Sequence, residues 1–310
     1  MRNSARRPSK EIHLGDLSFA LTLQVLALGL SLLLIAMTLF LFRGAFSSIS
    51  RFGWQFVTST TWDPVQEVFG AAPVLFGTLI SSLIAVLIAA PLSIGTALFL
   101  NETAPQKARR VVGFLIEMLA AIPSVVYGLW GIFVLAPWLR NTVEPQLVQH
   151  LGFIPLFRGP FYGVGMLAAG LILAIMITPT IFSISREIFK TIPNAQREAA
   201  LALGATRWEM MKISVLKGSR SGLIGAIILG LGRALGETMA VTMVIGNRSE
   251  ISSSLLAPAQ TMASVIANEY VEATTDIHIS ALIEIGLLLF GVAVVINFFA
   301  RVIASQGVRT

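Results

Sequence analysis

Six long apolar stretches alternate with polar segments along the chain. They lie at about residues 19–42, 73–100, 111–138, 161–185, 221–245 and 279–300. The shortest has 22 residues, and an α-helix needs about 20 apolar residues to cross the hydrocarbon core of a bilayer. The pattern therefore predicts an all-α, polytopic membrane protein with six transmembrane helices.

The polar segments set the expected domain boundaries. Residues 1–18 and 305–310 are expected to be tails around a single membrane domain, residues 19–304. The first apolar stretch is 24 residues long, whereas a signal peptide has an apolar core of roughly 7 to 15 residues, so we expect this stretch to remain as the first helix. In residues 186–220, apolar and charged residues interleave at helical spacing, which favours short amphipathic helices over a linker.

The composition fits a membrane protein and excludes several kinds of site. Apolar residues make up 55% of the chain and charged residues 12%, whereas soluble domains have about 25% charged residues. The chain has no cysteine, so no disulfide or thiolate site can form. The three histidines, His13, His150 and His278, are scattered without ligand spacing. We therefore expect no metal, no cofactor and no enzyme activity of the chain's own.

The basic residues sort by membrane side. With the N-terminus inside, the inner segments hold 16 lysines and arginines and the outer segments hold 5. Loops rich in lysine and arginine stay in the cytoplasm, so both termini are expected to be cytoplasmic. Because the basic residues sort by membrane side, we take the net charge of +6 as a sign of contact with membrane lipid, and we expect no nucleic-acid partner.

Two charged residues lie inside the fifth apolar stretch, residues 221–245. Arg233 is its thirteenth residue, and Glu237 follows four positions later, which would place both on one helical face. A charge near the bilayer centre costs about 3 kcal/mol on insertion scales, so it normally faces protein, water or a partner. We interpret the pair as a polar site on a transport path, where the guanidinium faces an anion. The alternative is a fixed Arg–Glu ion pair that only joins helices. Gly232 and Gly236 form a GxxxG pattern that favours close packing of another helix.

Two further acidic residues lie near the ends of apolar stretches. Glu117 is about two turns into the third stretch, and Glu284 is about one turn into the sixth. Both are expected to reach the polar edge of the membrane, as long charged side chains near helix ends commonly do.

The segment 186–220 contains a recognisable motif. It reads Glu198, Ala199, Ala200 and then Gly204 after three residues, which resembles the EAA loop of ABC importer permeases. In that family the loop forms two short helices that turn near the glycine, and one helix rests in a groove of an ATPase subunit. Gly204 permits such a turn because it has no Cβ. The family has a branched apolar residue and a proline where this chain has Ser214 and Lys217.

The side chains around the motif suit such a docking role. Ala200, Leu203 and Trp208 would offer an apolar face that can enter a groove. Nearby basic residues are expected to make contacts at the rim of that groove: Arg197, Arg207 and Lys212.

Three longer segments narrow the resemblance to the phosphate-specific, PstC-type branch of this permease family. They are AIPSVVYGLWG at 121–131, ILAIMITPTI at 172–181 and GLGRALGETMAVTMVIGN at 230–247. The resemblance implies a type I ABC importer permease-like fold in a bacterial or archaeal plasma (inner) membrane. It also implies a PstA-like second permease in a heterodimer, a PstB-like ATPase pair and an extracytoplasmic PstS-like phosphate-binding protein. The chain itself has no GxxxxGK[ST] motif, so ATP hydrolysis would belong to a partner.

The residues alone leave other functions open. A permease for another oxyanion would carry the same arginine, and a stand-alone anion transporter or channel would need no ATPase. Stand-alone transporters often show internal repeats with broken helices in both halves, whereas central charges occur in one half of this chain. A membrane scaffold would require neither the EAA loop nor the central Arg–Glu pair.

Overall fold

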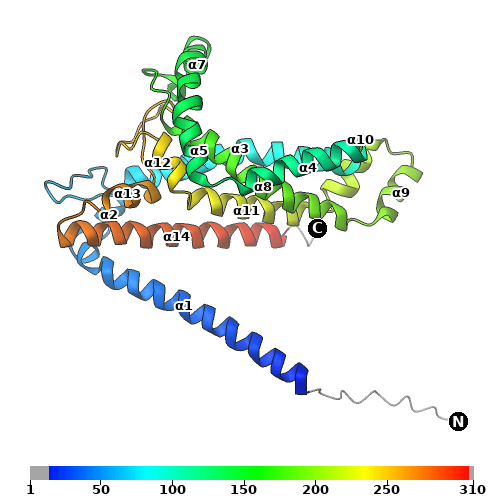
Figure 1. Cartoon of the computed structure of the whole chain (residues 1–310), viewed down its shortest axis with the longest axis horizontal. Helices are drawn as coiled ribbons and strands as arrows, with labels where there is room; N and C mark the ends of the chain where they lie inside the picture. Colours follow the sequence, from blue (N-terminus) through cyan, green and yellow to red (C-terminus); the bar gives the residue numbers. More distant parts are fainter. Residues whose placement is uncertain (1–13, 307–310) are drawn as a thin grey trace.

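Four long helices pack side by side and form the body of the molecule (Figure 1). The computed structural model describes residues 14–306, and no named β-strand occurs within that range. The four helices are α3 (Ala72–Glu102), α8 (Met166–Thr191), α11 (Arg220–Leu235) and α14 (Asp276–Gln306). An α-helix pairs most of its backbone N–H and C=O groups within itself, which is what a segment in lipid requires.

Helix α8 lies at the centre and contacts both α3 and α11. Small residues let these helices approach closely. A Cβ at Gly170 would stand 2.5 Å from Ile84 Cγ2 of α3, and a Cβ at Gly230 of α11 would stand 2.7 Å from Ile181 Cγ1. Small residues at helix interfaces in membranes let the backbones approach closely, and these two glycines allow that approach at both contacts of α8.

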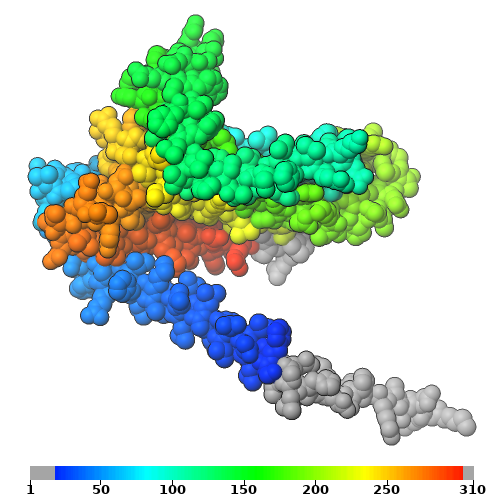
Figure 2. All heavy atoms as spheres, viewed as in Figure 1, coloured from blue at the N-terminus to red at the C-terminus, as the bar shows by residue number. Residues whose placement is uncertain are grey.

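Helix α1 (Leu14–Phe52) touches the bundle near its C-terminal end and diverges from it toward its N-terminal end (Figures 1 and 2). Gly44 lies against Ile283 of α14, and the Ser280 hydroxyl donates to the Gly44 carbonyl oxygen at 2.8 Å. The side chains of the apolar part of α1 are exposed. In this chain α1 is therefore held at one end.

The third expected span, residues 111–138, is not one straight helix. Helix α4 (Gln106–Ala121) ends before Pro123, and the helical run 124–151 that follows is bent by 96° from it. Proline has no N–H to continue the hydrogen-bond ladder, which explains the break. The run projects from the bundle as an arm (Figure 2). It consists of α5 (Ser124–Trp130), η1 (Gly131–Leu135), α6 (Ala136–Trp138), η2 (Leu139–Val143) and α7 (Glu144–Leu151).

The fifth expected span, residues 221–245, is also broken. Helix α11 has 16 residues, a rise of about 24 Å, which is less than the roughly 30 Å of a hydrocarbon core. It stops at Leu235, with Gly236 as its C-cap, and α12 (Met239–Val244) follows. Upstream, α10 (Arg207–Met210) and η4 (Met211–Leu216) form a run bent by 71° from α11.

Within residues 14–306, four helices are long and apolar enough to cross a membrane, namely α1, α3, α8 and α14, or up to six if each bent pair is one span. The remaining short helices lie in the connections between the long ones. They are α2 (Gln55–Thr58), η3 (Pro155–Phe157), α9 (Asn194–Ala202) and α13 (Met262–Glu269).

Several expected boundaries and one expected exposure differ from the structure. Helix α1 already begins at Leu14, inside the expected tail, and α14 continues to Gln306; the expected tail residues 1–13 and 307–310 lie outside the described range. Helix α8 begins at Met166 and not at residue 161. The expectation for Glu284 is wrong: its residue is 8% exposed because it lies inside the bundle.

Candidate functional site

Arg233 lies in the last turn of α11, on an exposed face of the helix. Its Nη1 donates a hydrogen bond to Thr180 Oγ1 of α8 at 3.2 Å. This is the one hydrogen bond of the Arg233 side chain to any residue between 14 and 306. A guanidinium has five N–H donors, so most of its donors remain available to a ligand.

Glu237 does not form the Arg–Glu bridge that was the alternative interpretation of this pair. The helix ends two residues earlier, so Glu237 lies in the break between α11 and α12 and not one turn along a continuous helix. Its Oε1 accepts from the backbone N–H of Ala240 at 3.3 Å, and the ion pairs of the described residues do not join it to Arg233. The two charges are near each other in sequence, yet in this structure each has a different partner.

The expected close packing at Gly232 and Gly236 does not occur within the part of the chain that the structure describes. A Cβ at Gly232 would have no atom within 4 Å, and a Cβ at Gly236 would meet the carbonyl oxygen of Gly232 at 3.8 Å. Leu229 is 58% exposed on this side of α11. The face that carries Arg233 is therefore open in the single chain.

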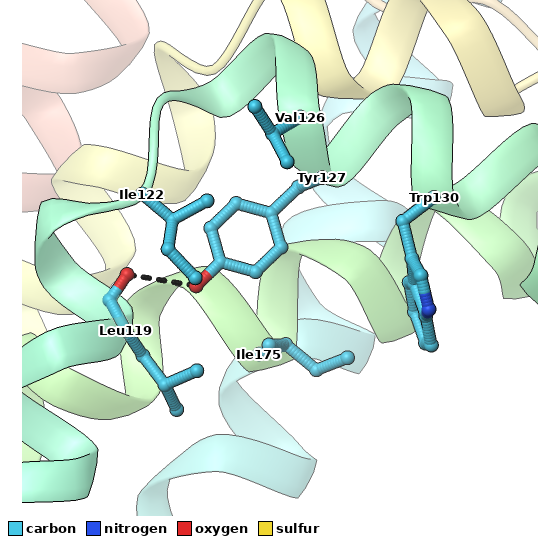
Figure 3. A pocket seen from close by; sticks show the side chains of 6 residues that line it. All are labelled: Leu119, Ile122, Val126, Tyr127, Trp130 and Ile175. Atoms are coloured by element: carbon cyan, nitrogen blue, oxygen red, sulfur yellow. Dashed lines mark hydrogen bonds between the residues drawn. The ribbon is translucent and has the colours of Figure 1, made fainter.

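An apolar pocket lies where α4 meets α5, beside this region (Figure 3). It has a volume of about 350 Å³ and is lined by Leu119, Ile122, Val126, Tyr127, Trp130 and Ile175. The Tyr127 hydroxyl donates to the Leu119 carbonyl oxygen at 2.7 Å, which ties the two sides of the bend together. No lining residue is charged, so this pocket is unsuited to holding an inorganic anion.

The EAA segment forms two short helices, α9 and α10, with Gly204 between them. Gly204 has φ +86°, a conformation that side-chain-bearing residues rarely adopt. Thr206 then caps α10: its Oγ1 accepts from the Glu209 backbone N–H at 3.3 Å, and its own N–H donates to Glu209 Oε2 at 2.8 Å. Hydrogen bonds from Thr206 hold the pKa of the Glu209 carboxyl below its usual value. The backbone N–H has the larger effect and the hydroxyl the smaller one.

The outer surface of this segment presents the motif. Glu198, Ala199 and Gly204 are exposed, and Leu203 is 90% exposed. Ala200 is half-buried against a cluster that includes Phe189 and Met210. The docking role assigned to this surface stays a prediction, because the structure contains no partner.

One expected rim contact is wrong. The Arg197 side chain is turned inward and pairs with Glu102 at the end of α3, with Nη2 and Oε1 2.9 Å apart. The sequence analysis also missed Thr180 as the residue that holds Arg233. The TPT at residues 178–180 was the available signal, because two hydroxyls beside a helical proline place polar groups inside an apolar helix.

Comparison with known proteins identifies the family of this chain. The family described as "binding-protein-dependent transport system inner membrane component" matches residues 89–306. The chain belongs to this family. The matched region covers more than half of the chain and includes both the EAA segment and Arg233.

Relatives within the family carry a common name. A protein of Mesorhizobium japonicum named phosphate transport system permease protein PstC is 46% identical over 305 residues, 97% of this chain and 93% of the relative. A protein of the same name from Pasteurella multocida is 45% identical over 298 residues, 95% of this chain and 93% of the relative. A probable PstC of Methanocaldococcus jannaschii is 40% identical over 264 residues, 83% of this chain and 84% of the relative. The predicted resemblance to PstC-type permeases is thereby confirmed.

Solved structures support the fold. The inward-facing MetNI methionine ABC transporter matches with a TM-score of 0.58 at 16% identity, over 80% of this chain and 99% of that chain. A bacterial ABC transporter that imports the acidic polysaccharide alginate matches with a TM-score of 0.55 at 18% identity, over 91% and 96%. The expected all-α fold of an ABC importer permease is confirmed.

Proposed function

We propose that this chain is the membrane-spanning permease subunit of an ATP-driven importer that moves inorganic phosphate into the cytoplasm. Its family supports the importer class, and the names of relatives at 40–46% identity support phosphate as the substrate. One structural observation carries the site: Arg233 lies on an exposed face of a membrane helix with a single hydrogen bond, to Thr180. Its remaining donors suit the oxygens of a tetrahedral anion.

The exposure of Arg233 supports a path shared with a second subunit. A guanidinium facing hydrocarbon costs about 3 kcal/mol or more, so protein or water must cover this face of α11. A PstA-like permease that packs along Gly225, Leu229 and Gly232 would do so, since these positions have no close neighbour or are exposed. The substrate path then runs between the two permeases of a heterodimer.

The groups around Arg233 support selection of phosphate. At neutral pH, phosphate carries at least one hydroxyl, whereas sulfate carries none. An ionised carboxylate only accepts hydrogen bonds, so Glu237 accepts from the phosphate hydroxyl while Arg233 binds other oxygens. Thr180 offers the guanidinium one uncharged acceptor. A phosphate oxygen can replace it, because a hydrogen bond between two ionised groups is stronger than one to a neutral hydroxyl.

The charge distribution supports the orientation and the coupling. Basic residues gather in 186–220, so the α9 end faces the cytoplasm, with both chain termini on that side of a bacterial or archaeal inner membrane. The exposed surface of Glu198, Ala199 and Leu203 docks there on a PstB-like ATPase pair. A PstS-like binding protein delivers phosphate from the opposite side.

Phosphate uptake by reconstituted vesicles tests the site. Arg233→Gln removes the guanidinium, whose paired N–H groups can donate to two phosphate oxygens. The loss of two charge-assisted hydrogen bonds, at about 1.5–3 kcal/mol each, corresponds to at least a hundred-fold loss of uptake. Arg301→Gln is the matched control, because it makes the same substitution at an exposed arginine of α14 outside the proposed path, and it should leave uptake nearly unchanged. Wild-type uptake by an assembled Arg233→Gln importer would show that Arg233 does not contact the substrate.

A further inference from the structure

The side chains of Glu102 and Arg197 form a largely buried ion pair with two hydrogen bonds between α3 and α9. Arg197 Nη2 lies 2.9 Å from Glu102 Oε1, and Arg197 Nε lies 3.2 Å from Glu102 Oε2. The Arg197 side chain is 14% exposed, and the Glu102 side chain is 7% exposed. A fork of two parallel N–H donors on two carboxylate oxygens fixes orientation as well as distance, so the pair holds the two helices at a defined angle.

Arg197 also binds the end of α8. Its Nη2 donates to the Phe189 carbonyl oxygen at 2.9 Å, and its Nη1 donates to the carbonyl oxygen of Ile192. The carbonyl groups of a last helical turn lack partners within the helix and attract a cation. One side chain of α9 therefore joins the ends of both α3 and α8.

Few other contacts attach α9 to the membrane helices. The helix has no buried residue. Ala200 is half-buried, and the Gln196 carbonyl oxygen accepts from Ser214 Oγ at 3.2 Å, which links α9 to η4 and not to α3. A force applied to the exposed surface of α9 thus reaches α3 through Arg197 and Glu102.

From Glu102, a continuous set of contacts leads to Arg233. Helix α3 is continuous from Ser93 to Glu102, and its Ser93 hydroxyl donates to the Thr178 carbonyl oxygen of α8 at 3.1 Å. Thr180, half a turn farther along α8, accepts the hydrogen bond of Arg233. The joint at Glu102 and the substrate site are therefore connected through α3 and α8.

We propose that Glu102 and Arg197 are a positioning pair that transmits the movement of the α9–α10 segment to α3 and so to the site of Arg233. The inference rests on the proposed docking of an ATPase on that segment. The pair contacts neither substrate nor ATPase; it converts a push on α9 into a displacement of α3. A pair that only helped the segment to fold would not affect coupling once the importer had assembled.

The test uses the complete importer in vesicles and compares basal ATP hydrolysis with hydrolysis stimulated by phosphate-loaded binding protein. Glu102→Gln and Arg197→Gln should each keep the ATPase bound and basal hydrolysis within about two-fold, while stimulation falls at least ten-fold. The reversed pair, Glu102→Arg with Arg197→Glu, should regain part of the stimulation. Glu117→Gln is the matched control, since Glu117 pairs with Arg186 at 3.1 Å without touching α9, and it should keep full stimulation.

A second arm remains informative if the single variants do not assemble. The chain has no cysteine, so Glu102→Cys with Arg197→Cys can be bridged by a short, reducible bis-thiosulfonate reagent in the assembled complex. Bridging should restore stimulation, and reduction should abolish it again in the same sample. Equal stimulation in the bridged and reduced states would overturn the proposal, as would full stimulation in assembled single variants. An unstimulated wild-type complex would instead refute the proposed function.

Discussion

Replacing Gly204 with valine should weaken the turn between α9 and α10 without any steric clash. A Cβ at Gly204 would have no atom within 4 Å, so the whole effect lies in the backbone, which has φ +86°. A residue with a side chain in this left-handed region costs about 1–2 kcal/mol, and β-branching adds to it. A change of 1–2 kcal/mol lowers the population of the turn by about 5- to 30-fold.

The assay is ATP hydrolysis by the assembled importer with and without loaded binding protein. Gly204→Val should lose most of the stimulation, because the turn no longer holds α9 in a fixed orientation relative to α10. Gly204→Asn is the matched variant, since asparagine tolerates φ above zero, and it should retain most of the stimulation. If valine and asparagine variants behave alike, the geometry of the turn does not control coupling and the reasoning is wrong.

Three other predictions concern orientation, selectivity and packing. An impermeant thiol reagent applied from outside should label Ser253→Cys and not Ala195→Cys, both at exposed positions; the reverse pattern would overturn the orientation. Glu237→Gln should lower phosphate and arsenate uptake together and weaken the exclusion of sulfate, because an amide can donate to sulfate oxygens; a proportional loss for all three anions would make the carboxylate structural. Gly230→Val should destabilise the chain by about 1–3 kcal/mol, because its Cβ would lie 2.7 Å from a neighbouring side chain, as thermal unfolding in detergent would measure. Gly232→Ala should leave this stability unchanged and impair only assembly with a second permease, visible as loss of co-purification.

Hydropathy predicted the long helices because it depends only on composition within a window. The bodies of α3, α8 and α14 fall where apolar residues run without interruption. A hydropathy average over a window does not show where a helix axis changes direction. The 96° bend at Pro123 and the break after Gly236 were therefore both missed. The break after α11 explains why Arg233 and Glu237, spaced for one helical face, do not pair.

The partners of charged residues were harder to predict, because they depend on tertiary contacts. Arg197 looked like a surface residue in its own segment, and Glu102 is 95 residues away in sequence. Glu284 lies near the end of an apolar stretch, where exposure is the ordinary expectation, yet α14 begins earlier and the bundle covers this residue. In contrast, the turn at Gly204 was predicted correctly because the requirement for a glycine is local.

The single attachment point of α1 has a consequence for biosynthesis. Two hydrogen bonds fasten it to Ser280, one with Gly44 and one with Ser48, and Gly44 and Ser280 are separated by 236 positions. At an elongation rate of about 5–20 residues per second, α1 waits roughly 10 to 50 seconds for the helix that receives it. During that time it must persist in the bilayer as an independent helix, held by lipid alone. Its uninterrupted apolar surface, which contributes little to the finished bundle, is what makes this waiting stage stable.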